Sequence, residues 1–303
     1  MRFTSYIWKQ KFKIIGLALF LFIISQLDMS RLLATLKTAD YRLFALAILF
    51  SVPNIFIKAL RWRYLARSKG MSISQAFKYY WIALFWGAVT PGKVGELFKV
   101  TYLKDHGLSS GSATAVTVID RLIDIICLFL LLYVAMFFVS FGMTGEIIWA
   151  TALLVAGIIA SILVLAFWRR FIKLFTGHID SFYAQARSYG LKTWLLALFA
   201  TFFTWGLFIV QRYIIAYALG IKVEPAYFAV VMLAMAFVTM IPISIQGIGT
   251  RDLVLVHFLG KVGYSKAEAV ALAALILCLM IFNTFIGYFT YLLYGKSSVA
   301  KRR

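Results

Sequence analysis

Long apolar runs recur along this chain, and they constrain its fold more than any other feature. A run of about 20 apolar residues is long enough to cross the hydrocarbon core of a bilayer as a helix. Hydrophobic residues make up 63% of the 303 residues and charged residues 14%, whereas soluble domains carry about 25% charged residues. The sequence therefore predicts an all-α polytopic membrane protein, with residues 1–303 as one membrane domain.

Six full spans are predicted, at residues 12–27, 41–60, 115–141, 146–168, 193–219 and 267–294. The intervening stretches 28–40 and 171–192 are predicted to be a polar connector and a polar, basic loop. Two further apolar segments are too short for a comfortable crossing, and each stops at a proline. We predict that these two segments begin re-entrant helical hairpins, over about residues 76–105 and 226–259.

Proline and glycine break both short segments. The break residues are Pro91, Gly92 and Gly95 in the first hairpin and Pro242, Gly247 and Gly249 in the second. In lipid, such a break is tolerated where the backbone is buried in protein or lines a wet cavity. The alternative is a helix that ends at the first proline and leaves Lys93, Glu96 and Lys99 in a cytoplasmic loop.

The two breaks belong to an internal repeat. A shift of 150 residues aligns Gly70 with Gly220. A shift of 156 aligns Glu96, Leu103, Gly107 and Ser109 with Asp252, Leu259, Gly263 and Ser265. The halves are residues 1–141 and 142–303, each with two spans, a hairpin and a third span. Three crossings per half predict an inverted repeat, and paired broken segments point to a transport site near the midplane.

Basic residues favour one side of this topology. Residues 1–13, 61–75, 104–114, 169–192 and 296–303 carry 18 Lys and Arg, whereas residues 28–42, 142–145, 220–225 and 259–266 carry six. The rich side is predicted to be cytoplasmic, with both termini inside. This asymmetry explains most of the net charge of +20, so nucleic acid is not an expected partner.

Charged residues cluster at both breaks. Five cations are predicted to bind substrate: Lys93, Lys99, Arg121, Arg212 and Arg251. Four acids are predicted to gate or balance them: Glu96, Asp120, Asp124 and Asp252. A half-helix start and arginine both suit a phosphate group.

Two alternatives stay open for these acids. In the first alternative, one of the carboxyls carries a proton for coupled transport. Alternatively, Asp120, Arg121 and Asp124 are an ordinary surface pattern at the cytoplasmic interface. The cysteines and histidines show no ligand spacing, so no metal, cofactor or catalytic residue is predicted.

Several short motifs together resemble a known family. The motifs are Arg61-Trp62-Arg63, Thr90-Pro91-Gly92 with Gly95-Glu96 and Lys99, Asp120-Arg121 with Asp124, and Pro242 with Gly247, Gly249 and Arg251-Asp252. They resemble the membrane domain of lysylphosphatidylglycerol synthases and the stand-alone flippase-like UPF0104 proteins. The resemblance implies an inner-membrane protein with paired hairpins that moves lipid between leaflets. It also implies no lysyl transfer, since the soluble aminoacyl-transferring domain is absent.

The predicted function is a lipid translocase, a flippase or scramblase for a phospholipid or a polyprenyl-phosphate-linked lipid. Its predicted partners are membrane lipids, and a homo-oligomer or a partner from envelope or lipid biosynthesis stays open. One alternative is an integral-membrane transferase that uses a polyprenyl-phosphate sugar, which needs a positioned acid or base. A non-transporting envelope scaffold is the other.

Overall fold

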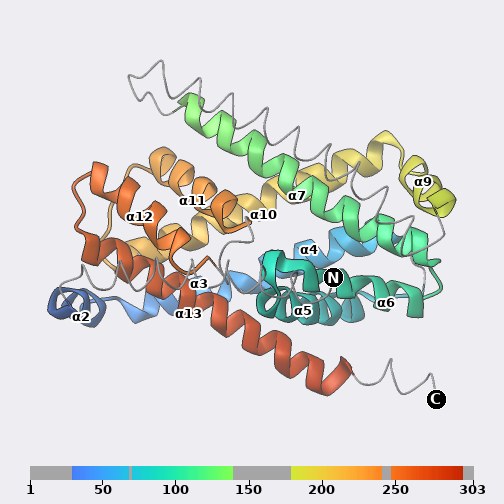
Figure 1. The fold of residues 1–303 in the computed structure, drawn as a ribbon, viewed down its shortest axis with the longest axis horizontal. Coiled ribbons are helices and arrows are strands. Elements are labelled where there is room, and N and C mark those ends of the chain that lie inside the picture. The colour runs from blue at the N-terminus through green and yellow to red at the C-terminus, as the bar shows by residue number, and fades with distance from the viewer. Residues whose placement is uncertain (1–28, 68–69, 139–178, 241–246, 296–303) are drawn as a thin grey trace, which may run out of the picture. The chain divides into compact units, whose positions relative to one another are not determined.

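The computed structural model describes residues 29–67, 70–138, 179–240 and 247–295. All regular structure in these residues is helical, which confirms the predicted all-α class (Figure 1). The elements are α2 (Met29–Lys37), α3 (Tyr41–Leu49), α4 (Ser51–Ala66), α5 (Ile73–Val89), the 3-10 helix η1 (Pro91–Phe98), α6 (Lys99–Asp105), α7 (Ser110–Phe138), α9 (Ile179–Arg187), α10 (Leu191–Ala218), α11 (Pro225–Met240), α12 (Thr250–Lys261), α13 (Lys266–Thr290) and the π-helical turn η2 (Tyr291–Gly295). The spans predicted at 12–27 and 146–168, and Pro242, lie outside the described residues.

Three helices in the described part of the chain are long and apolar enough to cross a membrane: Tyr41–Ala66, Leu191–Ala218 and Lys266–Gly295. They coincide with three of the predicted spans. Most of the span predicted at 115–141 is helix α7, whose 29 residues reach about 43 Å at 1.5 Å per residue. Apolar run length therefore located these four helices.

Two short helices occupy stretches that were predicted to be a connector and a loop. Helix α2 lies within residues 28–40, and its Leu36 packs against Ala267, Val270 and Ala271 at the start of α13. Helix α9 lies within residues 171–192 and packs against α7. Neither helix was predicted, because hydropathy alone does not reveal a short amphipathic helix whose one apolar face is covered by a neighbour.

The first apolar segment breaks at its predicted proline. Helix α5 ends at Val89, and η1 begins one residue after Thr90. The Thr90 hydroxyl donates to the Trp86 carbonyl (2.8 Å) and accepts from the Gly95 N–H (2.7 Å). A threonine side chain thus replaces backbone hydrogen bonds that the helix loses at its end. A Cβ on Gly95 would lie 2.1 Å from the Trp86 carbonyl oxygen, so only glycine fits there.

The helical segments that follow the two breaks differ in their first turns. After the first break the chain is a 3-10 helix up to Phe98 and becomes α-helical at Lys99. In the second, Gly247 and Gly249 have φ of 77° and 83°, and α12 begins at Thr250. Glycine adopts this left-handed region without the steric cost that a side chain brings.

The helices pack as two compact units. Unit 1 comprises the described residues of 1–51, 85–95 and 208–285, and unit 2 those of 52–84, 96–207 and 286–303. Each unit contains segments from both predicted halves of the chain, and the division into halves stays a prediction.

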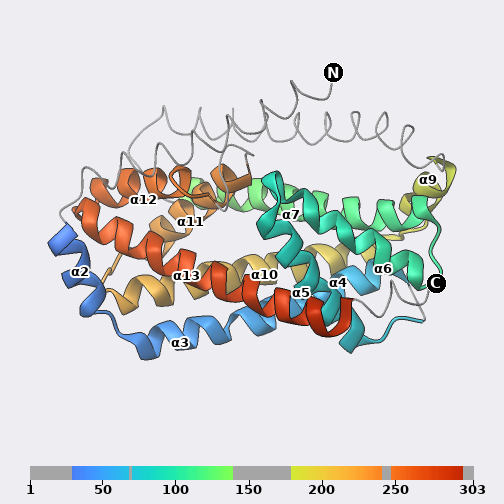
Figure 2. The ribbon, with the colours of Figure 1, turned by 60° about the horizontal axis from the view of Figure 1, so that its bottom comes forward.

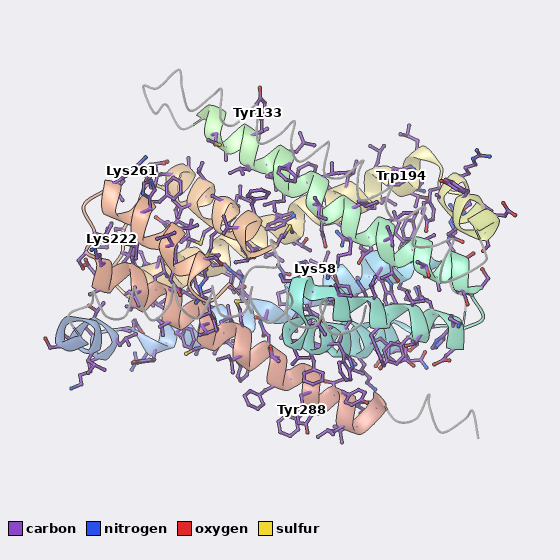
Figure 3. The ribbon with its side chains drawn as sticks, viewed as in Figure 1. Lys58, Tyr133, Trp194, Lys222, Lys261 and Tyr288 are labelled. Carbon is purple, nitrogen blue, oxygen red and sulfur yellow. The ribbon has the colours of Figure 1, made fainter. Side chains whose placement is uncertain are left out.

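Three connectors meet at one end of unit 1. The Asp40 N–H, after α2, donates to the Ala218 carbonyl at the end of α10 (2.7 Å). The Lys222 N–H, before α11, donates to the Tyr264 hydroxyl between α12 and α13 (2.8 Å). Lys222 and Lys261 both lie at this end (Figure 3). The connectors that meet here were all predicted to lie on the side poor in basic residues.

Unit 2 gathers the basic connectors. The Tyr189 hydroxyl, after α9, donates to the Leu65 carbonyl of α4 (2.7 Å), and the Arg67 guanidinium lies 5.2 Å from the centre of the Tyr189 ring. Ser112, in the first turn of α7, donates through its hydroxyl to the Ser181 carbonyl of α9 (3.4 Å). The contacts join the stretches 61–75, 104–114 and 169–192, all three of which were predicted to be cytoplasmic.

Helices α6 and α12 end in the same local geometry. Gly107 and Gly263, at the predicted offset of 156, have φ of 88° and 90°. In each case the N–H of the residue after the glycine donates to the carbonyl of the leucine that lies four residues before the glycine (3.1 Å). Ser109 and Ser265 then cap α7 and α13, and each hydroxyl accepts the N–H three residues later (3.1 and 3.3 Å). The aligned residues therefore share a backbone conformation.

Replacing Gly95 with alanine is expected to destabilise the protein, because the new Cβ would overlap the Trp86 carbonyl. Overpacking of this kind lowers the free energy of unfolding by about 1–3 kcal/mol. The matched control is Gly206→Ala within α10, where a Cβ meets nothing within 4 Å. Reversible unfolding in mixed micelles measures both, and equal stability of the two variants would show that the close approach is not required.

Candidate functional site

A buried carboxylate joins three helices of unit 2. Asp120, on α7, is 0% exposed, as is Lys99 at the start of α6, and Arg61 on α4 is 3% exposed. One oxygen of Asp120 accepts from Lys99 Nζ (2.7 Å) and the other lies 2.8 Å from Arg61 Nη2. Helices α6 and α7 lie side by side in both ribbon views (Figures 1 and 2). Lysine and arginine therefore share one acid inside the unit.

Arg61 uses its whole guanidinium in this cluster. Its Nη1 donates to Asp124, one turn after Asp120 on α7 (2.6 Å), and to the Thr201 hydroxyl on α10. Its Nη2 also lies 3.2 Å from the Asp120 carbonyl. The Lys99 ammonium lies 4.4 Å from the centre of the Tyr80 ring. Buried charges are stable when paired and hydrogen-bonded in this way.

A second ion pair flanks this cluster. Glu96, on η1, is 4% exposed and pairs with Arg121 of α7, whose side chain is 27% exposed. Lys93, two turns earlier in the break than Lys99, is exposed and has a left-handed φ of 57°. The structure thus places Glu96 and Lys99 inside unit 2, not in an open loop, whereas Lys93 is an exposed residue of unit 1.

The interior of unit 2 is close to electrical balance. Three cations, Arg61, Lys99 and Arg121, face three acids, Glu96, Asp120 and Asp124. Lys58 of α4 is half-buried and acts electrostatically on Asp124 (Figure 3). The burial of Asp120 and Asp124 differs from the surface pattern that was one alternative for this turn of α7.

Unit 1 holds the second charged group, at the start of α12. Arg251 and Asp252 are each 1% exposed and pair at 2.9 Å. The other oxygen of Asp252 accepts the Gly249 N–H (2.8 Å), which caps the helix. A Cβ on Gly247 would lie 2.5 Å from the Thr239 methyl of α11, so this turn is packed closely against that helix.

Arg212 of α10 lies in the same unit without a carboxylate partner among the described residues. Its guanidinium carbon lies 3.7 Å from the centre of the Phe208 ring, and its Nη1 donates to the Gln211 amide oxygen. It is half-buried and close enough to Arg251 for the two cations to repel each other.

Sequence reasoning missed Arg61. It was counted with the basic connector at residues 61–75 and not among the substrate-binding cations, whereas α4 continues to Ala66 and buries it. The signal lay in the acids: Asp120 and Asp124 are one helical turn apart, and such a pair inside a bundle requires cations from another helix. No three His, Cys, Asp or Glu residues in the described ranges group as a metal site.

Comparison with known proteins gives a match over most of the chain. The family model for the lysylphosphatidylglycerol synthase TM region matches residues 11–287. A UPF0104 membrane protein of Pyrococcus horikoshii is 25% identical over 306 residues, which cover 86% of this chain and 90% of the relative. No solved structure matches. The matched region contains both breaks and every charged residue described above.

Asp120→Asn is expected to lower the free energy of unfolding by about 3–5 kcal/mol, because two buried cations lose the carboxylate that they share. The control is Asp105→Asn at the exposed end of α6, for which a change within about 0.5 kcal/mol is expected. Unfolding in mixed micelles compares the variants. A neutral effect of Asp120→Asn would mean that Asp124 alone holds Arg61 and that Lys99 needs no counter-ion.

Proposed function

Because this chain belongs to the family of lysylphosphatidylglycerol synthase transmembrane regions, we propose that it is a lipid translocase. Its substrate is an anionic, phosphate-bearing lipid, which it moves between the leaflets of the inner membrane as a flippase or scramblase. The observation that carries the proposal is the placement of Lys99 and Glu96, which follow the Pro-Gly break directly and are buried in ion pairs.

Ion pairs of this kind suit the transfer of an anion. A cation inside a membrane protein is costly unless an acid compensates it. Asp120 holds Lys99, and Glu96 holds Arg121, which is partly exposed. In the proposed mechanism a lipid phosphate takes the place of a carboxylate on these cations, and the carboxylate returns when the lipid leaves. The acids thus act as internal competitors that keep the affinity for the headgroup low enough for release.

Contacts between α4 and α10 support an inverted repeat. These helices occupy equivalent places, since an offset of 150 aligns Asn54 with Thr204. The Asn54 side chain donates to the Thr204 carbonyl (2.8 Å), so two equivalent residues contact each other, as expected at a pseudo-twofold axis. Further along the chain from Asn54, Arg61 donates to Thr201 and Arg67 donates to Thr193. The residue numbers of the partners therefore fall as those of the donors rise, so the two helices run antiparallel. Equivalent helices that run antiparallel belong to halves of opposite orientation.

A second pair of contacts follows the same symmetry. In unit 2, Arg61 donates to the Thr201 hydroxyl. The equivalent residues at the offset of 150 are Gln211 and Ser51, and in unit 1 Gln211 donates to the Ser51 hydroxyl (2.8 Å). In the proposed topology the two breaks are re-entrant hairpins on opposite sides, with both termini in the cytoplasm. The meeting of basic connectors in unit 2 and of less basic connectors in unit 1 agrees with this arrangement.

Lys99→Gln is expected to lower lipid translocation by about tenfold or more, since it removes a charge-assisted contact to phosphate. The assay uses the purified protein in liposomes with fluorescent phosphatidylglycerol and fluorescent polyprenyl phosphate, tested separately. Lys104→Gln, which removes an exposed charge from the same helix, is the control and should transport as the wild type does.

Size-exclusion profiles must show both variants folded. If the wild type transports neither lipid, the translocase proposal is overturned. In that case a change in the chemistry of a polyprenyl-phosphate sugar would indicate a transferase instead.

The proposed orientation predicts which connectors face the outside. With the two native cysteines replaced, Lys222→Cys should react with a membrane-impermeant maleimide in spheroplasts. Arg67→Cys, in the connector after α4, should react only after the membrane is opened. The reverse labelling pattern would place the termini outside.

A further inference from the structure

Within the described residues, the chain passes between the two compact units five times. The crossings lie between residues 51 and 52, 84 and 85, 95 and 96, 207 and 208, and 285 and 286. Three of them fall inside the α-helices α5, α10 and α13, whereas the first lies at the start of α4 and the third lies in η1. Helices α7, α9, α11 and α12 each lie within a single unit. The units are therefore joined by a few identifiable stretches of backbone.

Each of the three crossing α-helices contains one glycine, and that glycine lies close to the crossing. Gly87 is the third residue after the crossing in α5, Gly206 is the second residue before the crossing in α10, and Gly287 is the second residue after the crossing in α13. By contrast, α11 has no glycine, and α7 and α12 have theirs at the second and the next-to-last residue. Glycine weakens a helix interior because it leaves the backbone unusually free. In these helices the weak position therefore coincides with the passage between units.

The two remaining crossings also coincide with breaks in regular helix. Pro53, the third residue of α4, follows the first crossing and has no N–H to donate to the Leu49 carbonyl four residues earlier. Gly95, within the 3-10 helix η1, is the last residue before the third crossing. Proline and glycine are frequent causes of helix bending. All five connections between the units thus contain a residue at which the backbone can bend.

Close packing does not explain the glycine in α10. Gly206 is exposed, and a Cβ there would meet nothing within 4 Å. Alanine would therefore fit at this position and is the better helix former. Gly95 differs, because a Cβ there would overlap the Trp86 carbonyl. Backbone freedom is the property that glycine supplies at Gly206.

We propose that these five stretches form a hinge about which the two units move as rigid bodies. Such a motion concentrates the change in backbone angles in a few weak positions and keeps the packing on either side. The contacts within each unit fit that behaviour. Arg61, Lys99 and Asp120 are joined inside unit 2, and Ser51 and Gln211 are joined inside unit 1.

The first break moves with unit 1 in this motion. Residues 85–95 belong to unit 1, whereas Glu96 and Lys99 belong to unit 2. The motion therefore displaces the break relative to the two buried ion pairs that directly follow it. In the translocase this displacement opens and closes access to Lys99, a role that rests on the proposed function.

Distances between spin labels on the purified full chain in liposomes test the motion. With both native cysteines replaced, labels at Lys222→Cys of unit 1 and Lys104→Cys of unit 2 report on movement between the units. Labels at Lys104→Cys and Val134→Cys, both in unit 2, form the control pair. All three residues are exposed. Pulsed electron paramagnetic resonance is expected to show two distance populations for the first pair and one narrow population for the control pair.

Two variants stiffen the proposed hinge. Gly206→Ala, which replaces an exposed residue with a better helix former, is expected to shift the ratio of the two populations by about fivefold. Pro53→Ala, also at an exposed residue, should shift it in the same direction. The control is Gly260→Ala in α12, an exposed glycine at which a Cβ would meet nothing within 4 Å, and it should leave the ratio unchanged. Lipid transport should slow in the first two variants only.

A single distance population for the first pair, as narrow as that of the control pair, would overturn the proposal. Equal effects of Gly206→Ala and Gly260→Ala would also overturn it. These outcomes differ from failure of the translocase function itself. A protein that shows both distances and moves no lipid retains the hinge, whereas a protein that moves lipid at one fixed distance lacks it.

Discussion

The sharing of Asp120 between Arg61 and Lys99 is the interaction on which the arrangement of unit 2 depends. The three residues come from α7, α4 and α6 and are buried. Removing one partner from such a cluster leaves an unpaired charge in the interior, which is energetically costly. The helices are therefore held together both by the attraction between the charges and by the cost of separating them. The chain after the Pro91 break must therefore return close enough to α7 for Lys99 to reach Asp120.

The close packing of the break makes that return possible. Gly95 lies against the carbonyl of Trp86, where a side chain would not fit, and the Thr90 hydroxyl binds both residues. The Trp86 carbonyl near the end of α5 and the Gly95 N–H are thus both hydrogen-bonded within the break itself. A non-helical segment among membrane-spanning helices is stable on the same condition, because its polar groups find partners in protein.

The sequence predicted the long helices because apolar length is a local property. Residues 193–219 and 267–294 correspond closely to helices α10 and α13. It did not predict the helix at Met29–Lys37, whose Leu36 is covered by α13 from the other end of the chain. Such a helix depends on a contact that no local pattern records.

The sequence likewise predicted some residues of the candidate site and missed others. Lys99, Glu96, Asp120 and Asp252 were identified because a charge within an apolar run is rare. Their partners were not. Arg61 follows an apolar run and resembles a basic flank, and only the continuation of α4 past it distinguishes a buried residue from one at the surface.

Segments that the predicted repeat aligns have similar backbone conformations but different charges. At the aligned offsets, Gly107 matches Gly263 in conformation, and the contact of Arg61 with Thr201 matches that of Gln211 with Ser51. However, a neutral glutamine stands where Arg61 would be, and Met280 stands where Asp124 would be. Among the described residues, Arg61 and Lys99 are therefore paired with acids, whereas Arg212 has no carboxylate partner.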